Sequence, residues 1–157
     1  MVEFRRRRSY NYPNFNTQKN QLMDFSLTLG LQKTGLPLIV TSGKLKNLCL
    51  LIDTGATHNI LFAYVYEHFK NEFKVLKSKQ NIMGIDGEYK ETPVSEATFN
   101  FEGTDYTSSF SVFDGSDAIR QIQEETGVQI HGILSTDFLV KNKWILDFDK
   151  LTIRTTD

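Results

Sequence analysis

The sequence predicts a mainly β fold with one or two short helices, and three observations support this prediction. Apolar and polar residues alternate over several short segments, which is typical of strands with one buried face. Glycine and polar residues separate these segments, as turns require. The chain has 157 residues, enough for one domain whose hydrophobic core needs no disulfide support.

Residues 1–24 are predicted to form a flexible basic N-terminal arm, followed by a folded domain at residues 25–157. They contain four consecutive arginines, Arg5 to Arg8, and many Asn and Gln residues without apolar periodicity. Such a run can bind nucleic acid, anionic lipid or an acidic protein, although a solvated tail is its commoner use. Because the formal net charge of the chain is only −1, we expect no nucleic-acid partner.

The first strands of the domain are predicted soon after the arm. Phe25, Leu27 and Leu29 alternate with polar residues, and Gly30 is expected to end this strand. Residues 36–40 form the next apolar segment. Two strands are therefore predicted ahead of the apolar run that begins at residue 48.

That run is followed by a carboxylate at the start of a tight loop. Residues 48–57 read Leu-Cys-Leu-Leu-Ile-Asp-Thr-Gly-Ala-Thr, and the apolar part has the length of a buried strand. Gly55 frees the backbone after Asp53, and Ala56 and Thr57 leave space around it. A carboxylate in this position is not an ordinary solvated charge, so it needs a partner or a chemical role.

Two segments have the apolar spacing of helices. Residues 60–76 follow the loop, and Thr57 or Asn59 would be suitable N-caps for a helix there. Residues 117–126 place their apolar side chains on one side, and Gly127 is expected to end that helix.

Two hairpins are predicted in the middle of the chain. Residues 81–92 contain a polar turn with two glycines between segments that can pair. The residues of this turn are Gly84, Ile85, Asp86 and Gly87. Residues 97–101 and 106–113 alternate well enough to form two further paired strands.

Residues 130–139 form a second motif, Ile-His-Gly-Ile-Leu-Ser-Thr-Asp-Phe-Leu. Its apolar half predicts a strand and its second half a short helix, for which Ser135 is a favourable N-cap. A closing strand is expected at residues 144–148, and residues 150–156 alternate again.

The motifs at residues 48–57 and 130–139 together resemble the two signatures of the retropepsins, the aspartic proteases of retroviral type. In that family a hydrophobic strand ends in Asp-Thr-Gly-Ala, and a strand ending in Gly-Ile-Leu lies beside it in a psi-shaped loop. The resemblance covers about residues 25–155 and implies a closed, β-barrel-like acid protease fold with one lobe per chain. The family pattern has a glycine where this chain has Ser135. The residues that the resemblance assigns to the psi-loop are Gly132, Ile133 and Leu134, and those that it assigns to a flap over the substrate are Gly84 to Gly87.

The resemblance also implies an aspartic endopeptidase, a hydrolase of peptide bonds, that works as a homodimer. Asp53 would be catalytic, and since the chain has one Asp-Thr-Gly loop, the second carboxylate would come from another copy. Two such carboxylates about 3 Å apart share one proton and activate a water molecule between them. The other residues of this active-site loop would be Thr54, which hydrogen-bonds across the two-fold axis, Gly55, Ala56 and Thr57. The partners expected are therefore a second copy and a protein or peptide substrate.

Residues 53–57 have two other interpretations. Asp-x-Gly-x-Thr also occurs as the phosphate loop of the actin, sugar-kinase and chaperone ATPase superfamily, but that fold needs two large lobes and an earlier motif. Asp-Thr-Gly also serves as a plain strand-to-turn junction, and the second motif favours the protease interpretation. Within the protease fold, the alternative to an enzyme is a catalytically degenerate module used for dimerisation or peptide binding.

The sequence offers no signal for a cofactor or a catalytic metal, and none is expected. His58, His68 and His131 lack the spacing of metal ligands, and Cys49 is expected to be a small buried hydrophobe. No apolar segment follows the arginines as in a signal peptide, and no run approaches the length of a bilayer span. We therefore expect a cytoplasmic protein without a membrane partner.

Overall fold

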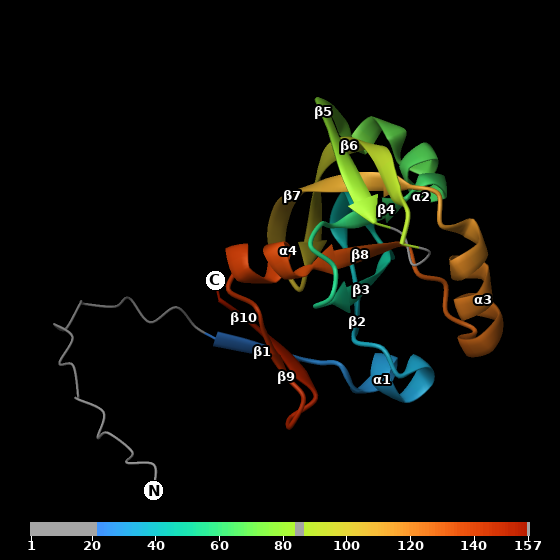
Figure 1. The fold of residues 1–157 in the computed structure, drawn as a ribbon. Helices are drawn as coiled ribbons and strands as arrows, with labels where there is room; N and C mark the ends of the chain where they lie inside the picture. The colour runs from blue at the N-terminus through green and yellow to red at the C-terminus, as the bar shows by residue number, and fades with distance from the viewer. Residues whose placement is uncertain (1–21, 84–86, 157) are drawn as a thin grey trace, which may run out of the picture.

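The computed structural model describes residues 22–83 and 87–156, which form two β-sheets, four α-helices and two 3₁₀ helices, η1 and η2 (Figure 1). The elements in chain order are β1 (Leu22–Ser26), α1 (Thr28–Thr34), β2 (Leu38–Val40), η1 (Gly43–Leu45), β3 (Cys49–Asp53), β4 (Ile60–Phe62), α2 (Ala63–His68), η2 (Lys70–Glu72), β5 (Lys74–Met83), β6 (Tyr89–Phe101), β7 (Thr104–Phe113), α3 (Ser116–Thr126), β8 (Gly132–Ser135), α4 (Thr136–Lys141), β9 (Ile145–Asp147) and β10 (Thr152–Thr156).

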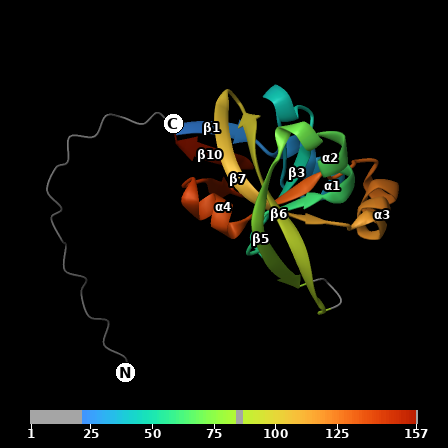
Figure 2. The ribbon, with the colours of Figure 1, turned by 90° about the horizontal axis from the view of Figure 1, so that it is seen from above.

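The larger sheet has seven strands and the smaller sheet three. Their orders are β2-β3-β8-β4-β7-β6-β5 and β1-β10-β9. In the larger sheet β8 runs parallel to β3 and antiparallel to β4, while β4 runs parallel to β7. Figure 2 shows the long strands β5, β6 and β7 crossing between α4 on one side and α3 on the other.

The prediction of a mainly β fold is confirmed, with two corrections. Four α-helices are present in the described part of the chain, where one or two were expected. The larger sheet is not closed into a barrel, because β2 and β5 remain as its edges. Within residues 22–83 and 87–156, no helix is long and apolar enough to cross a membrane.

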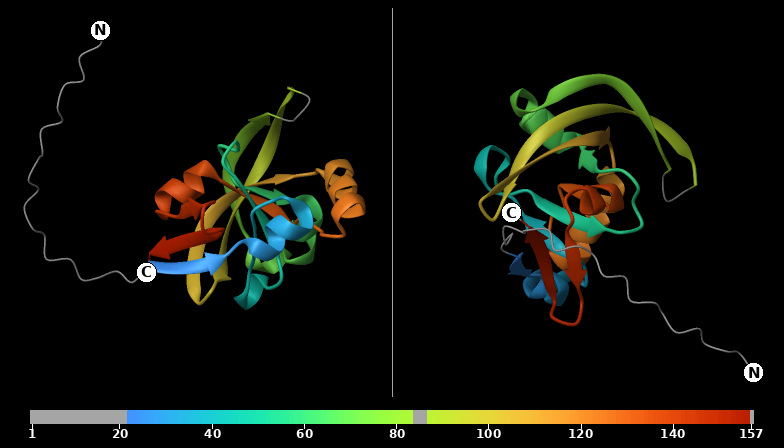
Figure 3. Two further views of the ribbon diagram at one scale, coloured as in Figure 1. Left: turned by 90° about the horizontal axis from the view of Figure 1, so that it is seen from below. Right: turned by 90° about the vertical axis from the view of Figure 1, so that its left-hand side faces the viewer.

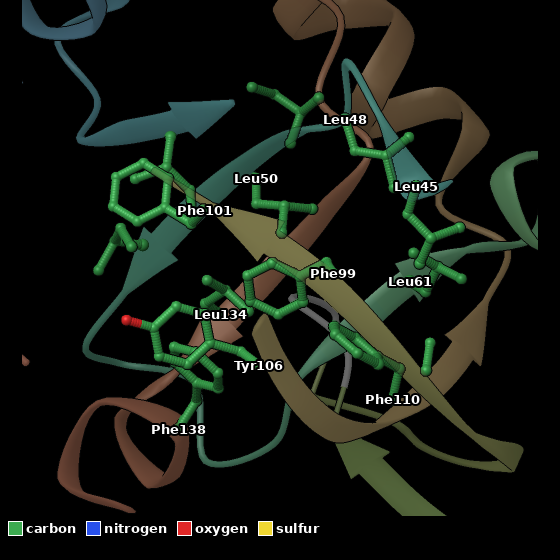
Figure 4. Packing of buried hydrophobic residues seen from close by; sticks show 14 of the residues in the cluster. Leu45, Leu48, Leu50, Leu61, Phe99, Phe101, Tyr106, Phe110, Leu134 and Phe138 are labelled. Atoms are coloured by element: carbon green, nitrogen blue, oxygen red, sulfur yellow. The ribbon is translucent and has the colours of Figure 1, made fainter. Parts of the chain in front are cut away.

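The hydrophobic core is built mainly from leucine and phenylalanine side chains of β3, β6, β7, β8 and α4 (Figure 4). In β3 the alternation places Leu50 and Ile52 in this core, whereas Cys49, Leu51 and Asp53 are half-buried on the other face. The same cluster contains Phe99, Phe110, Leu134 and Phe138. The strand period thus turns the carboxylate of Asp53 away from the core.

The strand predicted over residues 25–29 is wrong in position. β1 ends at Ser26, and Gly30, the predicted end, lies inside α1. The chain turns out of the strand where the Oγ of Ser26 accepts the backbone N–H of Thr28 at 3.2 Å. The helix then ends at Gly35, which adopts the left-handed conformation with a φ of 71°.

The smaller sheet attaches the beginning of the described chain to its end. β1 begins at Leu22, ahead of the domain boundary predicted at residue 25, and pairs antiparallel with β10. Arg154 donates to both carboxylate oxygens of Asp24, at 2.7 and 3.3 Å, and this hydrogen bonding lowers the pKa of Asp24. Residues 1–21 of the predicted arm lie outside the described residues.

The helix predicted over residues 60–76 is present only in part. The chain forms β4 first, then α2 and η2, and then enters β5. β4 pairs with both β7 and β8, so long-range strand pairing outweighs the local helical spacing. Neither Thr57 nor Asn59 caps α2, whose N-cap position is Phe62.

The two predicted hairpins and the second predicted helix are confirmed. β6 pairs antiparallel with β5 on one side and with β7 on the other. Helix α3 ends at Gly127 in the left-handed conformation, with a φ of 72°. Of the turn predicted between β5 and β6, Gly84, Ile85 and Asp86 lie outside the described residues, while Gly87 has a φ of 78°.

Backbone and side-chain hydrogen bonds join the start of β3 to the segment before β8. The Nδ1 of His131 accepts the backbone N–H of Cys49 at 2.9 Å, and the backbone N–H of His131 donates to the Cys49 carbonyl at 2.8 Å. The Tyr64 hydroxyl donates to the carbonyl of Ile130 at 2.6 Å. Cys49 is half-buried rather than buried as expected. Burial raises the pKa of its thiol, and raises the pKa of Tyr64 to about 12, so both groups are protonated at neutral pH.

We predict that His131 makes the fold sensitive to acid. Burial lowers the pKa of His131 below its ordinary value of 6.5. As the pH falls below that value, the unfolded chain takes up a proton that the folded chain does not, and the free energy of unfolding decreases. His131→Gln should remove this contribution, whose slope is at most about 1.4 kcal/mol per pH unit.

Urea unfolding of wild type and His131→Gln at about pH 7.5 and about pH 5.5 measures this contribution. His68→Gln is the control, because His68 is exposed. An equal loss of stability on acidification in all three proteins would contradict the prediction.

Candidate active site

Asp53 is the last residue of β3 and begins a tight loop of small residues. One carboxylate oxygen, Oδ1, accepts the backbone N–H of Gly55 at 2.8 Å. The backbone N–H of Ala56 donates to the Asp53 carbonyl at 3.2 Å. Thr54, Gly55 and Thr57 are exposed, while Ala56 and Asp53 are half-buried. The carboxylate is therefore fixed through one oxygen and is bordered by exposed small residues.

A side chain at position 55 would crowd the carboxylate of Asp53. A Cβ at Gly55 would lie 3.2 Å from the Oδ1 of Asp53. A side chain there would press on the oxygen that the Gly55 N–H holds. The third residue of the Asp-Thr-Gly motif thus has a local physical reason in this chain.

The second motif lies directly beside this loop and holds it. β8 runs parallel to β3 with Ser135 in register with Asp53. The Oγ1 of Thr136 donates to the Thr54 carbonyl at 2.7 Å, and the Thr136 backbone N–H donates to the Ala56 carbonyl at 3.0 Å. Two segments that are 82 positions apart therefore form one unit around the carboxylate.

Helix α4, which carries Thr136, is anchored in the core. Phe138 packs against Phe99 and Trp144, with ring centroids 5.7 and 5.0 Å apart. Ser135 is the N-cap of this helix, as the sequence predicted, and its side chain accepts the backbone N–H of Phe138. The loop around Asp53 is thus tied to a rigid element.

The three residues that the resemblance assigns to the psi-loop are buried or half-buried in β8. Leu134 is fully buried in the core, and Ile133 is half-buried and in register with Leu51 of β3. Gly132 allows a close approach to the strands on both sides: a Cβ there would lie 2.6 Å from the carbonyl oxygen of Ile60 in β4 and 3.2 Å from Cδ2 of Leu50 in β3. These residues bring the two motifs together, because β8 pairs with β3 along its length.

The hairpin of β5 and β6 curves over the loop between β3 and β4 (Figure 3, right). Gly87 is the described residue of the four assigned to the flap.

Asn59 has a structural role that was not predicted from the sequence. Its side chain is buried and hydrogen-bonds to β7 and to Ser135 instead of capping α2. The sequence does contain a signal for this role. Asn59 directly precedes the apolar residue Ile60, and Ser135 directly follows Leu134. Polar residues at the ends of buried strands need buried hydrogen-bond partners.

A polar cavity of about 190 Å³ lies beside the end of the loop. His58 lies at its rim, with Nδ1 4.0 Å from an oxygen of Asp137. Elsewhere in the described part of the chain, no group of three or more His, Cys, Asp and Glu side chains could hold a metal ion. The chemistry that this arrangement can support is that of a carboxylate with one free oxygen.

Two solved structures are similar to the chain in fold. The retroviral protease-like domain of Ddi1 from Leishmania major is 12% identical with a TM-score of 0.48, and the match covers 78% of this chain and 91% of that one. The EIAV protease in complex with the inhibitor HBY-793 is 19% identical with a TM-score of 0.47, covering 82% and 93%. No protein-family model and no curated protein sequence matches the chain. The likeness to these proteins is one of fold.

Proposed function

We propose that this chain is an aspartic endopeptidase whose active form is a homodimer with one Asp53 from each subunit. The observation that supports this most strongly is the place of Asp53. It ends a strand on the face turned away from the core, keeps one oxygen free, and lies in a loop that α4 fixes. Because the sequence has one Asp-Thr-Gly loop, a two-carboxylate site requires a second copy.

The chemistry follows from placing two carboxylates together. Two such groups about 3 Å apart cannot both be ionised, so the pair shares a proton and titrates as a unit. The ionised carboxylate takes a proton from a water molecule, and the protonated one donates to the oxygen of the peptide carbonyl. The water attacks the carbonyl carbon directly, so no covalent intermediate with the enzyme forms.

The remaining loop residues have proposed roles around an extended peptide. Thr54 would hydrogen-bond to the loop of the other subunit, and the carbonyl of Gly55 would accept a backbone N–H of the substrate. Ala56 and Thr57 would border the peptide. The turn from Gly84 to Gly87 would close over it as a flap, binding the peptide between two strands.

The surface that we propose for dimerisation is the outer edge of β9, which pairs with no further strand among the described residues. In the smaller sheet β10 is paired on both sides, by β1 and β9, so the outer edges left are those of β1 and β9. Near the β9 edge, Ile145 and Phe148 are 48% and 58% exposed. An unpaired strand edge with apolar neighbours is a template for pairing with another chain, and two-fold symmetry would pair β9 with its own copy.

Charged substitutions on this surface should weaken the dimer. Phe148→Asp or Ile145→Asp is expected to raise the dimer dissociation constant by at least about 30-fold, the equivalent of about 2 kcal/mol for a buried anchor. Activity should fall in parallel at low protein concentration and recover at high concentration. Sedimentation velocity and hydrolysis rates measured on the same samples check this.

Val75→Asp is the matched control for these substitutions. Val75 is 64% exposed and lies on β5, in the other sheet, so the same change adds the same charge away from the β9 edge. A dissociation constant that moves equally in all three variants would reject the β9 surface while leaving the dimer itself open to other surfaces.

The proposed function is tested by cleavage of a proteome-derived peptide library at acidic pH, with and without a statine-type mimic of the tetrahedral intermediate. Hydrolysis that the mimic inhibits and that EDTA leaves unchanged is the expected result. Binding of the mimic without any cleavage would instead identify a peptide-binding module of the same fold. Cleavage lost on adding EDTA would reject the carboxylate mechanism.

A further inference from the structure

We propose that Asn59 is a positioning residue that, together with Ser135, holds the Asp53 loop in its working geometry. This inference rests on the proposed function for its effect on catalysis. The hydrogen bonds from which it is argued do not depend on the proposed function.

Asn59 uses every polar group of its side chain. Its Nδ2 donates to the Oγ of Ser108 at 2.8 Å and to the carbonyl of Ser109 at 3.1 Å. Its Oδ1 accepts the backbone N–H of Ser135 at 2.9 Å and the Ser135 hydroxyl at 3.0 Å. Asn59 is 7% exposed, so water cannot replace these partners without a rearrangement.

Ser135 carries the connection from Asn59 to the loop. It is 0% exposed, so its hydroxyl needs an acceptor inside the protein. Asn59 supplies that acceptor, and the hydroxyl oxygen in turn accepts the N–H of Phe138 at the start of α4. The next residue, Thr136, makes the two hydrogen bonds to the carbonyls of Thr54 and Ala56.

The path is therefore continuous from β7 to the carboxylate. Asn59 fixes Ser135, Ser135 fixes the first turn of α4, Thr136 fixes the loop, and the Gly55 N–H fixes Asp53. Removal of Asn59 would leave the Ser135 hydroxyl and backbone N–H without their acceptor. Since reacting groups displaced by about 1 Å can cost about 100-fold in rate, loosening this path should affect catalysis.

The test compares three single variants with wild type in the full chain. Asn59→Asp is nearly isosteric and keeps the oxygen that accepts from Ser135, but it loses both donors to β7 and so breaks the path at its first step. Ser135→Ala keeps the Cβ and removes only the hydroxyl, so it provides a milder change if the first variant folds poorly. The matched control is Asn100→Ala, because Asn100 also donates to one partner, Asp105, and accepts from two, Gly103 and Ser42.

Two readouts are needed, one of which does not depend on activity. With a cleaved reference peptide, Asn59→Asp and Ser135→Ala should lower kcat by about ten- to 100-fold while KM changes by less than about threefold. Amide hydrogen exchange, followed by NMR, should accelerate by about tenfold or more at Gly55, Ala56 and Thr136 in the same variants. Asn100→Ala should change neither quantity.

The outcomes separate this proposal from the proposed function. Unchanged exchange at Gly55, Ala56 and Thr136, or an unchanged kcat in an active enzyme, overturns the role of Asn59. If the wild type cleaves nothing, the proposed function fails. The exchange rates then still decide whether Asn59 and Ser135 hold the loop.

Discussion

Asp53→Asn is expected to lower the hydrolysis rate by about 10³-fold or more while the fold is kept. The amide has nearly the same shape, and its oxygen can still accept the Gly55 N–H that holds Oδ1 in the wild type. The amide cannot take a proton from water, so the general base is lost. Single-turnover and steady-state rates on the reference peptide, with near-UV circular dichroism as the check of folding, measure this effect.

The matched control for this substitution is Asp117→Asn. The Asp117 side chain on α3 is 98% exposed and lies outside the loop, so the same loss of charge should leave the rate unchanged. Asp53→Asn that keeps more than a few per cent of the wild-type rate, in a preparation free of other proteases, would reject the aspartic mechanism.

Mixing the two forms extends this test to the second copy. A dimer of one wild-type and one Asp53→Asn subunit holds a single carboxylic acid and should be inactive. Adding excess Asp53→Asn to a constant amount of wild type should therefore lower activity as the subunits exchange. Activity that stays constant in the mixture, while sedimentation shows mixed dimers, would mean that each subunit acts alone.

Local signals predicted several elements of this fold correctly. Gly127 ends α3 in the left-handed conformation because that conformation costs glycine little. Ser135 caps α4 because its hydroxyl accepts a free N–H of the first turn. The apolar run before Asp53 forms β3 with alternate burial. In each case the information lies within a few residues of the position predicted.

Predictions failed where distant partners decide the structure. Ile60 to Phe62 belong to a segment with helical spacing, but they form strand β4 and pair with β7 and β8. Residues 25–29 alternate as a strand would, yet β1 starts at Leu22 because β10 sets the pairing. Alternation and spacing do not contain the register with strands that lie far away in the sequence.

The same reason explains what was missed at the candidate site. The motif located Asp53 and its loop, because the chemistry and the turn are encoded locally. The partners of Asn59 lie 49 to 76 positions away on β7 and β8. A single sequence gives no direct sign of such pairings, and a buried asparagine resembles an exposed helix cap until its neighbours are known.

Gly132→Ala should destabilise the fold by about 3 kcal/mol or more. The new Cβ would lie 2.6 Å from the backbone carbonyl oxygen of Ile60 and 3.2 Å from Leu50 Cδ2. β8 is paired with β3 on one side and β4 on the other, so it cannot move away without breaking a ladder. The expected result is a lower midpoint of urea unfolding with an unchanged slope.

Gly115→Ala is the control for this prediction. The added methyl there would lie 2.9 Å from Cε1 of the Phe62 ring, which is a side chain that can shift, so about 1 kcal/mol is expected. Both variants add a methyl group close to a neighbouring atom. They differ in whether that neighbour, a backbone carbonyl in one case and a phenylalanine ring in the other, can move away. A loss for Gly132→Ala no larger than that for Gly115→Ala would mean that β8 and β4 can separate cheaply. In that case the glycine of the second motif would not be what keeps β8 beside the Asp53 loop.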